Sequence, residues 1–212
     1  MTTINKTKRY AGPDVAVADA VAGAIPATKP SFFSTLMVLF KARVVSLLLF
    51  SAVGGAFMGA GGWPGLGVLG LTLVTGWLAA SGASAWNQYI ERRSDGTMTR
   101  TCHRPLVNGD IANPRWVPWV ATGMIVLSVL IALPFSLALA FWLAAGAFIY
   151  VVIYTLWLKP RTTLNIVIGG AAGAFPPMIG WAAVTGSVGI ESLLLFLIIF
   201  MWTPPHFWAL AL

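Results

Sequence analysis

Residues 44–90 read VVSLLLFSAVGGAFMGAGGWPGLGVLGLTLVTGWLAASGASAWNQYI, and this run decides the fold because it contains no aspartate, glutamate, lysine or arginine. Residues 116–158, 162–190 and 192–212 share that property. A helix needs about 20 apolar residues to cross a bilayer. The first two runs are long enough for two spans each, and the last two for one each. Turn residues at 61–65 and at Pro134 divide the long runs.

We therefore predict an all-α fold, a polytopic membrane helix bundle with six transmembrane helices. The predicted helices cover residues 44–60, 66–89, 116–133, 135–158, 164–185 and 192–212. The composition agrees, because 58% of the 212 residues are hydrophobic and 9% are charged. An average soluble protein has roughly 25% charged residues, so the composition excludes a soluble domain.

In this topology all the basic residues lie on one side of the membrane. All thirteen lysines and arginines precede the first predicted helix or lie between helices two and three or four and five. The positive-inside rule makes that side cytoplasmic, with the N-terminus and the polar loops there. The net charge of +7 then reflects contact with the headgroups of the lipid bilayer, and no nucleic acid partner is expected. We expect a bacterial inner membrane protein.

The chain divides near residue 40. Residues 1–40 are predicted to be a mobile cytoplasmic tail with a candidate interfacial helix at about 31–41. Residues 41–212 form the predicted transmembrane domain. Cys102 is the one cysteine, which excludes an intrachain disulfide.

The most informative polar segment is WNQYIERRSDGTMTRTCHRP at residues 86–105. If the preceding helix continues to Asp95, then Asn87, Glu91 and Asp95 lie on one face at positions i, i+4 and i+8. Two carboxylates and an amide oxygen are ligands that Mg²⁺ prefers. Arg100 and Arg104 follow, and guanidinium groups bind phosphate oxygens. The segment thus indicates a site for Mg²⁺ and a diphosphate.

Two structural interpretations of the same residues remain open. Glu91 and Asp95 could pair with neighbouring arginines on a solvated loop. Asn87 could join helices by a hydrogen bond, the commoner role of amides within a membrane. The spacing alone does not decide between these interpretations and the metal site.

The wider pattern resembles the signature of the UbiA-type prenyltransferase superfamily. It consists of Asn87, Glu91, Asp95, Met98, Arg100, Thr101, Arg104 and Gly109. Three further stretches resemble the protohaem IX farnesyltransferase (haem O synthase) family within it: LKPRT at 158–162, NIVIGGAAGAFPP at 165–177 and WTPPHFWAL at 202–210. The resemblance runs from about residue 41 to residue 212.

This resemblance implies transfer of the farnesyl group of farnesyl diphosphate to the vinyl group of haem B, which makes haem O. It implies Mg²⁺ as cofactor on the catalytic residues Asn87, Glu91 and Asp95. The diphosphate contacts would be Arg100, Arg104, Lys159 and Arg161. One alternative is prenylation of an aromatic acceptor in quinone biosynthesis, and another is a non-enzymatic transporter or structural subunit.

The resemblance also implies nine helices, with a second acidic motif after the sixth. The prenyltransferase domain is therefore expected to be incomplete at its C-terminus here, and the 212-residue chain alone to be inactive. His206 either contacts the haem or bonds a backbone carbonyl that the adjacent prolines leave unpaired. Gly169 and Gly173 either allow close helix packing or leave room for a substrate.

Overall fold

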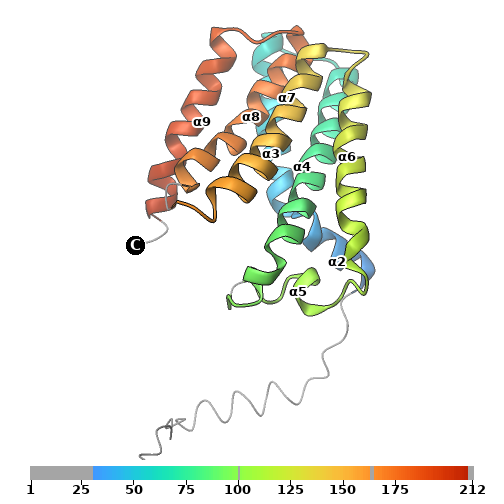
Figure 1. Ribbon diagram of the computed structural model, residues 1–212. Coiled ribbons are helices and arrows are strands. Elements are labelled where there is room, and N and C mark those ends of the chain that lie inside the picture. The colour runs from blue at the N-terminus through green and yellow to red at the C-terminus, as the bar shows by residue number, and fades with distance from the viewer. Residues whose placement is uncertain (1–30, 100, 163–164, 210–212) are drawn as a thin grey trace, which may run out of the picture. The chain divides into compact units, whose positions relative to one another are not determined.

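The structure is a computed structural model that describes residues 31–99, 101–162 and 165–209, and all regular elements in this part are helices (Figure 1). The all-α prediction is confirmed. The elements are α2 Phe32–Leu39, α3 Ala42–Ala60, α4 Leu66–Asp95, α5 Pro105–Asn108, η1 Pro114–Trp116, α6 Val117–Ala132, α7 Leu137–Phe148, η2 Ile149–Leu158, α8 Asn165–Thr185 and α9 Ile190–Ala209.

Six helices are long and apolar enough to cross a membrane, as the sequence predicts. They are α3, α4, η1 with α6, α7 with η2, α8 and α9. The predicted turn at 61–65 is present, and Gly61 and Gly65 have φ values of 61° and 87° that favour glycine. The turns after α3, α6 and α8 lie at one end of the bundle in Figure 1, and α5 lies at the other. The chain is a multi-pass membrane protein.

One helix differs in type from the prediction. The C-terminal half of the fourth span, η2, is a π-helix of 10 residues rather than an α-helix. The helix α2 coincides with the candidate interfacial helix. The expectation of a mobile tail at residues 1–30 lies outside the described residues.

Close backbone contacts hold α8 against α3. A Cβ atom on Gly55 would overlap the carbonyl of Pro177, and one on Gly180 would overlap the carbonyl of Ala52. Without side chains at these positions the two helix backbones touch. Small residues at helix interfaces allow such contact where lipid supplies no hydrophobic driving force between helices. α8 also packs against α7 and α9, and α4 packs against α3 and α6.

The length of α4 carries the polar segment beyond the apolar layer. Its 30 residues extend about 45 Å, whereas the hydrocarbon core of a bilayer is about 30 Å thick. The last turns of α4 therefore extend into the interfacial layer, at the end of the bundle where α2 and α5 lie (Figure 1). This is where Asn87, Glu91 and Asp95 are found.

Candidate active site

The three predicted oxygen ligands are buried at the end of α4. The helix continues to Asp95, as the i, i+4, i+8 argument requires. Asn87 is 1% exposed, Glu91 6% and Asp95 3%. A solvated loop is therefore not their environment, and burial of two carboxylates requires compensating charges.

Arg104 and Lys159 supply those charges. Arg104 Nη1 lies 2.5 Å from Asp95 Oδ2 and 3.5 Å from Glu91 Oε2. Lys159 Nζ lies 2.5 Å from Glu91 Oε1. The loop after α4 returns to the helix because the Thr101 hydroxyl donates to the Asp95 carbonyl over 3.0 Å. Two carboxylates and two cations thus form a compact cluster drawn from α4, the start of α5 and the end of η2.

A second set of contacts joins this cluster to the start of α3. Lys41 Nζ donates to Asn87 Oδ1 over 2.9 Å and to the Tyr150 hydroxyl over 3.2 Å. Asn87 Nδ2 donates to Thr155 Oγ1 over 3.2 Å. Burial and the nearby Arg104 guanidinium lower the pKa of Lys41 from 10.5 to about 8. Asn87 therefore links α3 to η2, as the packing interpretation expects, while its amide oxygen faces a cation.

Sequence reasoning missed Lys41 and Thr155. Their partners lie 46 and 68 residues away along the chain, so local spacing contains no signal for them. A weak signal exists for Lys41, because it is one of the last two cations before the charge-free run that starts at residue 44.

The other predicted site residues are not part of the cluster. Arg161 is exposed and donates to the Trp157 carbonyl over 3.1 Å. His206 is exposed, and its ring stacks on Trp202 with centroids 4.3 Å apart. Arg100 lies outside the described residues. Of the four predicted diphosphate contacts, the structure therefore brings Arg104 and Lys159 together with the carboxylates.

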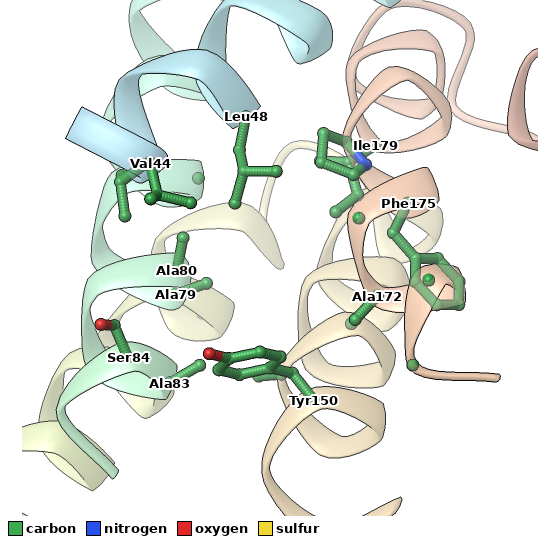
Figure 2. Close-up of a pocket in the computed structure, with 18 of the residues that line it drawn as sticks. Val44, Leu48, Ala79, Ala80, Ala83, Ser84, Tyr150, Ala172, Phe175 and Ile179 are labelled. Carbon is green, nitrogen blue, oxygen red and sulfur yellow. The ribbon is translucent and has the colours of Figure 1, made fainter. Parts of the chain in front are cut away.

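An apolar cavity of about 450 Å³ opens beside the cluster. Its polar lining groups include Lys41, Ser84, Tyr150 and Tyr154. Figure 2 shows Ser84 and Tyr150 at one end of the cavity. The apolar walls come from α3, α4, α7, α8 and α9, and include Val44, Leu48, Ala52, Ala79, Ala80, Ala83, Phe175 and Ile179.

The glycines of α8 form part of this cavity wall. Gly169 packs against the Tyr154 ring, and Gly170 against Thr203. Gly173 has open space where a Cβ atom would be. Gly169 therefore allows close packing of α8 against η2, as the packing interpretation expects, whereas Gly173 fits the alternative of room for a substrate.

The donor set fits a magnesium ion in kind, because it offers two carboxylates and one amide oxygen, all hard ligands. Within the described ranges, no group of three histidine, cysteine, aspartate or glutamate residues could hold a metal ion. An ion at Glu91 and Asp95 therefore needs further oxygen ligands, from Asn87, from water or from a bound phosphate. A phosphate would also meet the cations of the cluster.

Curated relatives share nearly half of the sequence. Protoheme IX farnesyltransferase of Polaromonas naphthalenivorans is 46% identical over 190 residues, which cover 88% of this chain and 62% of the relative. The protein of the same name from Deinococcus radiodurans is 44% identical over 199 residues, 91% of this chain and 63% of the relative. That from Roseiflexus castenholzii is 46% identical over 187 residues, 87% of this chain and 34% of the relative. The chain thus spans between one third and two thirds of these relatives.

A solved structure has the same fold. It is a UbiA homolog from Archaeoglobus fulgidus bound to DMAPP and Mg²⁺, with a TM-score of 0.65 and 18% identity. The match covers 82% of this chain and 62% of the homolog. The UbiA prenyltransferase family matches residues 48–212. Together with the buried polar cluster at the end of α4, this match shows that the chain belongs to the UbiA prenyltransferase family.

Proposed function

We propose that the protein transfers the farnesyl group of farnesyl diphosphate to the vinyl group of haem B and so makes haem O. The observation that carries the proposal is the paired acidic and basic cluster beside an apolar cavity of about 450 Å³. A polar head and an apolar tail on one substrate match these two environments. The relatives named protoheme IX farnesyltransferase support haem B as the acceptor.

The head of the substrate is proposed to bind at the end of α4. Asn87, Glu91 and Asp95 would hold Mg²⁺, which when bound supplies positive charge to the leaving diphosphate. Arg104 and Lys159 already lie at these carboxylates and would bind phosphate oxygens through charge-assisted hydrogen bonds. Arg100 and Arg161 remain proposed contacts of the same diphosphate.

The tail of the substrate is proposed to occupy the cavity. Its volume is within the usual range for a ligand site, and its apolar walls exclude water from the reacting carbon. Tyr150 and Tyr154 stack with ring centroids 5.7 Å apart at the polar end. Their faces would stabilise positive charge on that carbon through the ring quadrupole.

The proposed reaction breaks one carbon–oxygen bond and adds a carbon atom and a hydroxyl group across the vinyl double bond. The bond between carbon 1 of the farnesyl group and the diphosphate oxygen breaks, and carbon 1 bonds to the terminal vinyl carbon of haem B. The other vinyl carbon takes the hydroxyl group of a water molecule, whose second proton is released. Diphosphate leaves. His206 is proposed to contact the haem, because its ring stacks on Trp202, which lines the cavity.

The proposed setting is a bacterial inner membrane with the cluster on the cytoplasmic side. Among the described residues, every lysine and arginine lies at the ends of spans or in loops on the side of α5. The positive-inside rule assigns that side to the cytoplasm. Residues 1–40 are proposed to be a tail that precedes the prenyltransferase domain.

The test uses two proteins, because the chain spans 62% of the Polaromonas relative. One is the 212-residue chain, and the other is a chimera in which this chain is continued by that relative's sequence beyond the aligned region. Each is reconstituted in lipid with haem B, farnesyl diphosphate and Mg²⁺, and products are identified by mass spectrometry. We expect haem O from the chimera and none from the short chain, because two carboxylates hold Mg²⁺ poorly against its hydration.

Two control reactions test which acceptor is prenylated and whether prenyl transfer needs Mg²⁺. A parallel reaction contains 4-hydroxybenzoate in place of haem B, and a second omits Mg²⁺. Prenylation of the aromatic acceptor alone would overturn haem B as the acceptor, but it would still support the proposed prenyl transfer. No prenylated product from a correctly inserted chimera with either acceptor would overturn the proposed function.

A further inference from the structure

Lys41 has an unusual backbone conformation at the break between α2 and α3. Its φ is 49° and its ψ is 47°, and it is the one non-glycine residue with positive φ in the described part of the chain. L residues adopt this left-handed region at an energetic cost, which persists where the surrounding structure imposes it. Contacts from neighbouring helices must therefore hold Lys41 in this conformation.

Two side chains of α4 hold the break in place. Gln88 Nε2 donates to the Val38 carbonyl over 2.8 Å and to the Leu39 carbonyl over 2.9 Å. Ser84 Oγ donates to the same Leu39 carbonyl over 3.3 Å. The last carbonyls of a helix lack partners within the helix, so these bonds fix the end of α2. Gln88 is 1% exposed, which makes it an internal support for the turn that carries Lys41.

The Lys41 ammonium group lies between the charged cluster and the cavity. It donates to Asn87 and Tyr150, and Lys41 lines the cavity. Arg104 and Lys159 each form an ion pair with a carboxylate, whereas Lys41 is in none of the ion pairs among the described residues. Glu91 and Asp95 act on Lys41 only at longer range, and a partly buried cation without a directly paired anion is costly. This position therefore favours an anionic ligand group at the cavity end of the cluster.

We propose that Lys41 binds the diphosphate from the cavity side, at the phosphate joined to the prenyl chain, and that Gln88 positions Lys41. The inference rests on the proposed function. Two of the three ammonium N–H groups bond to Asn87 and Tyr150, and the third suits a phosphate oxygen. The Asn87 oxygen has two lone pairs, so its bond to Lys41 leaves one for the metal ion.

The test measures binding without reaction. The 212-residue chain and the chimera are placed in nanodiscs with Mg²⁺, and affinities are measured for farnesyl thiolodiphosphate, which does not react, for farnesol and for haem B. The variants are Lys41→Met, Lys41→Gln, Lys41→Arg and Gln88→Leu. Arg43→Met is the matched control, because it removes an exposed cation two residues away. Thermal unfolding identifies variants that do not fold.

We expect Lys41→Met and Lys41→Gln to weaken binding of the thiolodiphosphate about ten- to a hundredfold, as loss of a charge-assisted hydrogen bond predicts. Farnesol and haem B should bind as before. Lys41→Arg should recover most of the affinity, Gln88→Leu should lose part of it, and Arg43→Met should stay within about twofold of the wild type because exposed charges contribute little.

Equal affinity of Lys41→Met and the wild type for the thiolodiphosphate would overturn the inference and leave the proposed function intact. Equal losses for farnesol and the thiolodiphosphate would also overturn it, because a structural role affects both. A loss confined to haem B would assign Lys41 to the acceptor instead. If neither wild-type protein preferred the thiolodiphosphate to farnesol, the proposed function itself would fail.

Discussion

Asp95 offers the sharpest test of the proposed metal and diphosphate site. Its side chain is 5% exposed and accepts from Arg104 over 2.5 Å. Asp95→Asn removes one negative charge and changes the shape of the side chain very little. The amide oxygen of asparagine can still accept from Arg104, and Glu91 remains 3.5 Å from the same guanidinium nitrogen.

The expected effects on folding and on reaction differ in size. A hydrogen bond from Arg104 to a neutral amide in place of a carboxylate costs about 1–2 kcal/mol, whereas a buried cation left without any partner would cost about 3–5 kcal/mol. The variant should therefore insert and fold. The reaction should slow at least about a hundredfold, which corresponds to about 2.7 kcal/mol in the barrier.

The assay compares initial rates of haem O formation by the chimera and its Asp95→Asn form, with the amount of inserted protein measured in the same membranes. Asp110→Asn is the matched control, because Asp110 is an exposed carboxylate in the same loop and should retain full activity. If Asp95→Asn kept more than about a tenth of the wild-type rate, the role of Asp95 in charge stabilisation would be refuted.

Three further predictions follow from the fold and the cavity. A cysteine at Gly62, where a side chain meets open space, should react with an impermeant thiol reagent in intact cells, whereas Cys102 should not; the reverse pattern would invert the topology. Gly180→Ala should lower the thermal midpoint, because its Cβ overlaps a carbonyl of α3 and overpacking costs about 1–3 kcal/mol. Gly67→Ala, which meets open space in α4, should not lower it. Ala79→Phe should favour geranyl over farnesyl diphosphate, since Ala79 lines the cavity about 12 Å along α4 from Asn87; an unchanged preference would place the tail elsewhere.

The spans could be predicted because the bilayer imposes simple demands on the sequence. Runs without charge give the helices, and the sorting of cations gives their number. The predicted end of the second helix at residue 89 is six residues short of Asp95. Hydropathy falls at the membrane surface, whereas helical hydrogen bonds continue as long as other contacts support them. The π-helix at Ile149–Leu158 follows apolar sequence that also suits an α-helix, so composition could not reveal it.

The site residues that lie on one helix could be predicted from the sequence, whereas those that come from distant segments of the chain could not. Asn87, Glu91 and Asp95 share a face because of helical periodicity alone. Spacing does not predict which cations join the site. Lys159 and Arg161 are two residues apart, but Lys159 pairs with Glu91 whereas Arg161 is exposed. The turn after η2 decides this, and its geometry depends on contacts that spacing does not encode.

The placement of charge at the end of α4 would also orient the proposed prenyl diphosphate. The carboxylates of Glu91 and Asp95 are balanced by Arg104 and Lys159, whereas Lys41 on the cavity side adds a positive charge. A prenyl diphosphate can satisfy this arrangement in one direction, with phosphate oxygens between Lys41 and the cluster and the tail in the apolar cavity. In the opposite direction the tail would meet four charged side chains, and Lys41 would face the apolar cavity without an anionic ligand group, which carries a desolvation cost. If the proposed substrate binds here, this asymmetry of charge would fix which end of it enters the membrane.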